Sequence, residues 1–238
     1  MALLRRPVSS TRADFSPPAT LYDNKTRRAL AEITRQFRYQ VESNSCYPTC
    51  VTNALQDLGL SHGNPDLAVH QAEVNRLCGY KDWMGPKSEV VVKNLNRRLN
   101  PLGHRAYEKN GVTLGELRRV LDDVECSFPV IGLQQEYFKE EWGIDFGEQK
   151  TKPDHTVILL LQNDEQMGFY DPFEGRTQRM HQRNQGNGKG VVVLPTPRVS
   201  AYWESARESS WFMWLRREKT LAGNQTLIDD IIPRHGGS

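Results

Sequence analysis

The pattern of hydrophobic and polar positions divides this chain into a helical first half and a strand-rich second half. The clearest helical pattern follows Cys46, where apolar residues recur on one face until Gly59, which is predicted to end the helix. This face is made of Cys50, Val51, Ala54, Leu55 and Leu58. Pro48 fits the first turn, because proline lacks the N–H that the first turn of a helix leaves unbonded. We therefore expect Cys46 at or just before the helix N-terminus.

Other segments also carry helical patterns. Helices are expected over residues 24–38, 64–79 and 87–99, which have apolar residues at helical spacing. Thr113 is followed three positions later by Glu116, and this pair predicts a capping box at the start of a short helix. A last helix is expected over residues 200–217, where several aromatic side chains suit packing against the body of the protein.

After Cys126, short apolar runs rich in β-branched residues replace the helical spacing. Strands are predicted over residues 128–134, 156–162, 167–171 and 190–195. The polar residues 163–166 are predicted to form a turn between two of these strands. Helices followed by strands predict an α+β fold, with the helices on one side of a mainly antiparallel sheet.

The length indicates one folded domain with loosely attached ends. A chain of 238 residues can bury a full core without disulfide bonds. Residues 1–23, rich in Ser, Pro, Thr and Arg, are predicted to form an N-terminal arm. Residues 24–218 are predicted to form the domain, and residues 219–238 a C-terminal tail.

Charge and hydropathy argue against several classes of protein. The chain has 31 basic and 29 acidic residues, and a formal charge of +2 gives no electrostatic footprint for nucleic acid. No apolar run approaches the ~18 residues of a membrane span. The apolar piece before Arg5 is too short for a secretory signal. We expect a soluble, cytoplasmic protein.

The four cysteines do not follow the spacing of a disulfide framework or a metal site. Cys46 and Cys50 are one helical turn apart, whereas Cys78 and Cys126 stand alone. A zinc site would need two close pairs of ligands, and a thioredoxin-like redox pair has the spacing CxxC. We expect Cys50, Cys78 and Cys126 to pack as small apolar residues. No metal or organic cofactor is expected.

Cys46 is a candidate nucleophile because its predicted position provides what a reactive thiol needs. The positive end of the helix dipole favours the thiolate, and a histidine can take up the proton. Of the six histidines, His155 opens a strongly apolar strand, which would hold its ring in place. Asp171 ends the next strand, so a hairpin would bring it near enough to orient His155. Gln40, six positions before Cys46, can supply an amide N–H to an oxyanion.

The order of these motifs resembles the papain-like cysteine peptidase superfamily. Within it, the chain is similar to the bacteriocin-processing peptidases that cleave double-glycine leaders, whose nucleophile motif is Q-x5-C-G-P-T. The matching segments here are Gln40 with Cys46-Tyr47-Pro48-Thr49, Pro129-Val130-Ile131, Asp154-His155-Thr156-Val157-Ile158 and Asp171-Pro172. The resemblance covers about residues 36–215. It implies Cys46 as nucleophile, His155 as base, Asp171 as orienting residue and Gln40 as oxyanion donor.

Two residues depart from the motifs of that family. Tyr47 and Asp154 replace glycines, and both are expected to narrow the space beside the nucleophile. The resulting hypothesis is a cysteine peptidase or isopeptidase that cleaves a peptide or protein substrate. Three alternatives remain open: the same triad used for acyl transfer or deamidation, an inactive papain-like binding module, and an enzyme that a partner must activate. A purely structural reading of Asp171 is also open, in which it caps the turn before Pro172 and Gly175.

Overall fold

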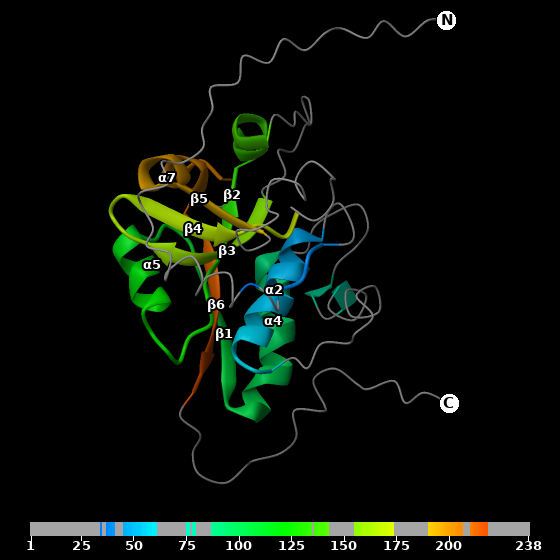
Figure 1. The fold of residues 1–238 in the computed structure, drawn as a ribbon. Helices are drawn as coiled ribbons and strands as arrows, with labels where there is room; N and C mark the ends of the chain where they lie inside the picture. The colour runs from blue at the N-terminus through cyan, green and yellow to red at the C-terminus, as the bar shows by residue number, and fades with distance from the viewer. Residues whose placement is uncertain are drawn as a thin grey trace, which may run out of the picture.

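In the computed structural model, the described residues are 34, 37–40, 45–60, 75–76, 78–79, 87–134, 136–142, 155–173, 190–206 and 210–218. The helices are α2 (Cys46–Asp57), α4 (Ser88–Leu99), α5 (Leu114–Leu121) and α7 (Thr196–Glu204), with a 3-10 turn (Asn100–Leu102) and a π-helical turn (Phe138–Trp142) (Figure 1). The strands are β1 (His104–Lys109), β2 (Val130–Leu133), β3 (His155–Gln162), β4 (Gln166–Tyr170), β5 (Val191–Pro195) and β6 (Phe212–Arg217).

The strands form a six-stranded sheet in the order β1-β6-β2-β3-β4-β5. Every neighbouring pair is antiparallel. The predicted turn between β3 and β4 is present, and the main-chain N–H of Asn163 donates to the carbonyl of Gln166 at 2.9 Å. The α+β prediction is therefore confirmed.

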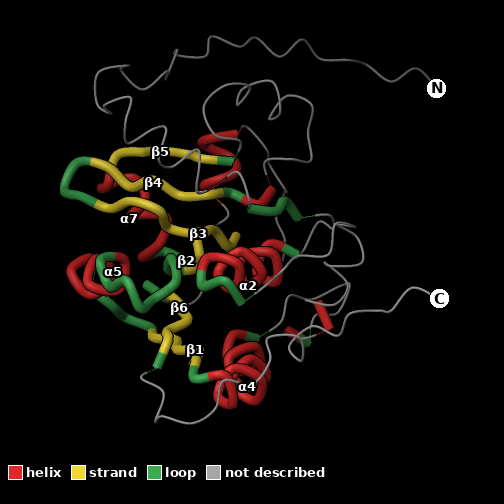
Figure 2. Tube along the Cα trace, turned by 60° about the horizontal axis from the view of Figure 1, so that its bottom comes forward, coloured by secondary structure: helices red, strands yellow, loops and turns green. Residues whose placement is uncertain are grey.

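Helices cover both faces of the sheet, so the expectation of a one-sided arrangement is wrong. The helices α2 and α4 lie on one face, and α5 and α7 lie on the other (Figures 1 and 2). The core clusters show the same division along β3, because Ile158 packs with α2 whereas Val157 and Leu159 pack with α5 and α7. Six of the eight residues of β3 are buried in succession from its first position. Such a continuous buried run needs cover on both faces.

The sequence correctly predicted both ends of α2. Cys46 is its first residue, and Pro48 lies in the first turn. After the last helical residue, Gly59 adopts φ of 71° and donates to the carbonyl of Gln56, while Leu60 donates to that of Leu55. This pair of bonds is a Schellman motif, which needs the left-handed conformation that glycine adopts readily. The fixed ends hold Cys46 at a defined place on the sheet.

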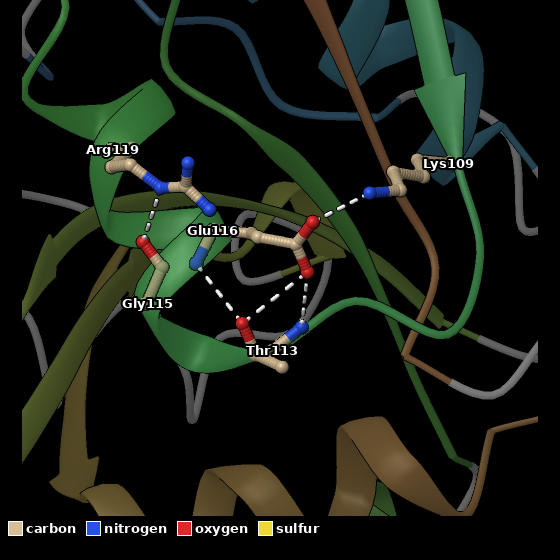
Figure 3. Close-up of polar contacts among 5 residues, drawn as sticks. All are labelled: Lys109, Thr113, Gly115, Glu116 and Arg119. Carbon is tan, nitrogen blue, oxygen red and sulfur yellow. Dashed lines mark hydrogen bonds and ion pairs between the residues drawn. The ribbon is translucent and has the colours of Figure 1, made fainter.

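The predicted capping box is also present at the start of α5 (Figure 3). The Thr113 hydroxyl accepts from the N–H of Glu116, and the Glu116 carboxylate accepts from the N–H of Thr113. Lys109 reaches the other carboxylate oxygen of Glu116 from the end of β1. The helix 87–99 is likewise confirmed as α4.

Two strands were not predicted. The strand β1 lies at the edge of the sheet and buries only Ala106 among its six residues, so its sequence reads as polar loop. The strand β6 was predicted as the second half of a helix over 200–217. Helix α7 ends at Glu204, and the chain turns at Ser210, whose φ is 51°, before entering the sheet. Residues 212–217 are apolar enough to form a helix or a strand, and their pairing with β1 and β2 favours the strand.

Several predictions concern residues outside the described ranges. These are the N-terminal arm 1–23, most of the helices 24–38 and 64–79, and the tail 219–238. In the part of the chain that the structure describes, no helix is long and apolar enough to cross a membrane.

Candidate active site

The β3–β4 hairpin brings His155 and Asp171 together. His155 is the first residue of β3, and Asp171 follows the last residue of β4. Ile158 pairs with Tyr170 in the hairpin, so the next residue of the β4 chain lies close to the start of β3. The His155 Nε2 atom lies 2.7 Å from Asp171 Oδ1, and both side chains are almost fully buried. The adjacency that the hairpin predicted is therefore present.

Among the described residues, three hydrogen-bond donors hold the Asp171 carboxylate. Besides His155, the main-chain N–H of Phe173 donates to Oδ1 at 2.8 Å. The hydroxyl of Tyr137 donates to Oδ2, also at 2.8 Å. A buried carboxylate needs such donors to remain ionised and fixed. Asp171 thus has a defined orientation toward the imidazole.

Cys46 reaches the same imidazole from the opposite face of the sheet. It is partly exposed at the first position of α2, and its thiol hydrogen-bonds with His155. Because Nε2 is engaged by Asp171, Nδ1 is the ring nitrogen available to the thiol. Thr156 also bonds to Cys46, through both its main-chain N–H and its hydroxyl. The alternation of β3 accounts for the bond from the hydroxyl, since the side chains of Thr156 and Ile158 face α2.

These contacts favour an ion pair between Cys46 and His155. Burial opposes ionisation of the thiol, but the hydrogen bond and charge of His155, with the bonds from Thr156, outweigh it and lower the pKa of Cys46. Burial likewise disfavours a charged imidazole, but Asp171 and Cys46 together raise the pKa of His155 to about 10. The N-terminus of α2 adds further stabilisation of a thiolate.

Cys50 has a different environment, as predicted from its place on the apolar face. It is fully buried, and its Sγ donates to the main-chain carbonyl of Thr156 at 3.3 Å. Burial raises the pKa of Cys50 well above its ordinary value, and negative charge at Cys46 and Asp171 adds to this effect. The two cysteines of this turn therefore differ sharply in acidity.

Aromatic side chains enclose the His155 ring. Tyr137 lies parallel to it, with ring centroids 5.9 Å apart and an interplanar angle of 5°. The Phe138 centroid lies 4.4 Å away, and the Phe173 ring is nearly perpendicular to that of His155, with the centroids 6.3 Å apart. This apolar shell limits the access of water to the ion pair and strengthens its electrostatic interactions.

Gln40 is buried, and its main chain is fixed beside Asp171. Its N–H donates to the carbonyl of Pro172 at 2.9 Å. Two residues earlier, the main chain of Arg38 bonds at both its N–H and its carbonyl to the side chain of Asn53 in α2. The segment that carries Gln40 is thus tied both to α2, which begins with Cys46, and to the chain directly after Asp171. Residues 41–44, which join Gln40 to Ser45, lie outside the described ranges.

Tyr47 does not line the space beside the nucleophile, contrary to expectation. Its side chain is buried in the core, where its hydroxyl donates to the sulfur of Met213 at 3.2 Å. Its ring makes a T-shaped contact with that of Trp211, with centroids 5.4 Å apart. Position 47 is therefore occupied by a core residue that ties α2 to β6. Asp154, the second departure, lies outside the described residues.

The sequence did not reveal three residues that shape the site. Tyr137 contacts Asp171 and Thr156 contacts Cys46, and the carbonyl of Gly190 accepts the main-chain N–H of Asp171 at 2.8 Å. Thr156 could have been found from strand alternation next to His155. No local pattern marks Tyr137. The histidine His104 lies away from this site, with its Nδ1 against the carbonyl of Leu102.

Comparison with models of protein families and with curated proteins finds no match for this chain. Among the described residues, no cluster of three or more His, Cys, Asp or Glu side chains is arranged to hold a metal ion.

Proposed function

We propose that this protein is a papain-like thiol hydrolase that cleaves a peptide or isopeptide bond. One observation carries the proposal. The partly exposed Cys46, at a helix N-terminus, hydrogen-bonds an imidazole whose other nitrogen lies 2.7 Å from a buried carboxylate. A nucleophile, a base and an orienting group in this order make up the triad of acyl-transfer enzymes.

The reaction begins from the thiolate–imidazolium pair. The Cys46 sulfur attacks the substrate carbonyl carbon, and the charge moves to the carbonyl oxygen. His155 then donates its proton to the leaving amine, and a thioester joins the acyl group to Cys46. In the second half, His155 takes a proton from water as the water attacks the thioester. The bond between the acyl group and the Cys46 sulfur breaks, the acid product is released, and the thiolate–imidazolium pair is regenerated. Asp171 keeps the ring in one orientation through both halves.

The oxyanion would be held by the main-chain N–H of Cys46 and the side-chain amide of Gln40. Each donor of this kind is worth roughly 3 kcal/mol in the transition state. The support for Gln40 is its buried position and the attachment of its main chain to Pro172 and to Asn53 through Arg38.

The experiment is to incubate the wild-type protein and Cys46→Ala with a peptide library derived from a proteome, and to analyse the products by mass spectrometry. We expect new peptide termini with the wild type and none with the variant. Intact peptides that gain about one mass unit at glutamine would instead assign deamidation to the same acyl-enzyme chemistry. Cleavage retained in Cys46→Ala would overturn the proposal.

A further inference from the structure

Tyr137 lies where a side chain can act on both the imidazole and the carboxylate of the proposed triad. It follows β2, three residues after Gln134, whose N–H is bonded to the carbonyl of Tyr202. Its ring is fully buried and parallel to that of His155. Its hydroxyl is 2.8 Å from Asp171 Oδ2. One residue therefore contacts both groups that prepare the nucleophile.

The ring of Tyr137 is fixed from several directions. Phe169 of β4 contacts it with centroids 5.6 Å apart, and Tyr202 of α7 does so at 5.9 Å. Tyr202 is itself held in place, because its hydroxyl hydrogen-bonds to the carboxylates of Glu140 and Glu141. The Tyr137 hydroxyl consequently has little freedom to leave Asp171.

The two oxygens of the carboxylate receive different donors. Oδ1 accepts from His155 and from the N–H of Phe173, whereas among the described residues Oδ2 accepts from Tyr137. If that hydroxyl were missing, a charged oxygen would face an apolar site without a donor, which is costly. The proton between His155 and Asp171 would then shift from the imidazole toward the carboxylate. The imidazole would then stabilise the Cys46 thiolate less well.

We propose that the Tyr137 hydroxyl is a positioning group for the triad: it keeps Asp171 ionised and aimed at His155, so that Cys46 remains a thiolate. This inference rests on the proposed function of Cys46, and it adds a residue that controls the reactivity of the Cys46 thiol. Tyr137 does not touch the sulfur or the substrate in this role, and it acts through Asp171 and His155.

The test is the pH dependence of Cys46 alkylation by iodoacetamide in Tyr137→Phe, which keeps the ring and removes only the hydroxyl. We expect the midpoint of the profile to rise by about half a unit to one unit, so that the rate below the midpoint falls about threefold to tenfold. The matched control is Tyr107→Phe. Tyr107 lies on the edge strand β1, and the variant removes its hydroxyl, which is bonded to Glu218. This variant should leave the alkylation profile unchanged.

A purely structural role would lower the melting temperature of Tyr137→Phe and leave the alkylation midpoint where it is, and this result would overturn the inference. If Tyr137→Phe does not fold, a fluorotyrosine at position 137 provides the second test, because it keeps ring and hydroxyl and makes the hydroxyl a stronger donor. The midpoint should then fall, and an unchanged or raised midpoint counts against the inference. A wild-type Cys46 with the reactivity of an ordinary thiol would contradict the proposed function instead, so the two failures are distinguishable.

Discussion

The main-chain N–H of Asp171 donates to the carbonyl of Gly190 at 2.8 Å, one residue beyond the paired ends of β4 and β5. The bond extends the ladder of the sheet and fixes the carboxylate that faces His155. Gly190 has φ of 91°, and a Cβ at this position would lie 2.3 Å from the ring of Tyr170. The place of Asp171 therefore depends on a glycine that comes nineteen residues later in the chain.

Replacing Gly190 by alanine should disturb the site as well as the fold. Tyr170 must move away from the new methyl group, and we expect a loss of about 2 kcal/mol or more in the free energy of unfolding. The movement also displaces Asp171, so the alkylation rate of Cys46 should fall. Gly111→Ala is the control, because Gly111 also has a positive φ but has no atom within 4 Å of the added Cβ. Equal effects of the two variants on alkylation would contradict this account.

Asp171 is expected to act on His155 through both orientation and charge, and two variants separate these roles. Asp171→Asn keeps an acceptor for His155 and removes the charge. Because that charge helps to raise the pKa of His155 to about 10, the alkaline limb of the activity profile should move to lower pH in this variant. Asp171→Ala removes both roles and should lower the rate about a hundredfold. Identical profiles for wild type and Asp171→Asn would show that the charge has no part.

The activity of the wild type should have a bell-shaped dependence on pH. The rate requires a thiolate at Cys46 and a proton on His155 for the leaving group. It should rise as the pH passes the pKa of Cys46, which lies below the ordinary value for a thiol, and fall as the pH passes about 10, where His155 loses its proton. The profile is measured with a substrate found in the peptide screen. An alkaline limb near the ordinary pKa of histidine would contradict the raised value.

The capping box at α5 makes a separate prediction about stability. Thr113→Ala should lower the free energy of unfolding by about 1 kcal/mol, and Thr113→Ser should largely retain it.

Hydrogen bonds from Lys109 and Thr113 lower the pKa of Glu116 to about 2. Glu116 thus contributes stability that is present above its unfolded pKa and is lost as the pH falls through about 2. The difference in denaturant midpoint between wild type and Glu116→Gln should narrow from pH 6 to pH 3. A constant difference would contradict the role of the charge.

The sequence predicts those parts of the fold that depend on local patterns. The ends of α2, the cap of α5 and the hairpin after His155 follow from proline, glycine and capping residues that act over a few positions. The edge strand β1 escaped prediction because it buries little, and β6 because its pairing partners are distant in the sequence. The residues of a short segment do not reveal which distant strand it will pair with.

The same division applies to the site. Cys46, His155 and Asp171 could be proposed together because helix start, strand start and hairpin each have a sequence signal. Tyr137 could not, since its contact with Asp171 joins the segment after β2 to the end of β4 across the sheet. The position of Tyr47 was misjudged for a related reason: its side chain contacts Met213 of β6, a strand that was not predicted, and Trp211 directly before that strand.

The most direct test of the central claim is the relative rate at which iodoacetamide modifies the four cysteines at pH 6.5, followed by peptide mass mapping. Cys46 should react first, because its pKa is lowered, whereas burial raises the pKa of Cys50, Cys78 and Cys126. In His155→Ala the advantage of Cys46 should disappear. Similar rates for all four cysteines in the folded wild type, or a rapid Cys46 that persists in His155→Ala, would contradict the assignment of Cys46 and His155 as a catalytic pair.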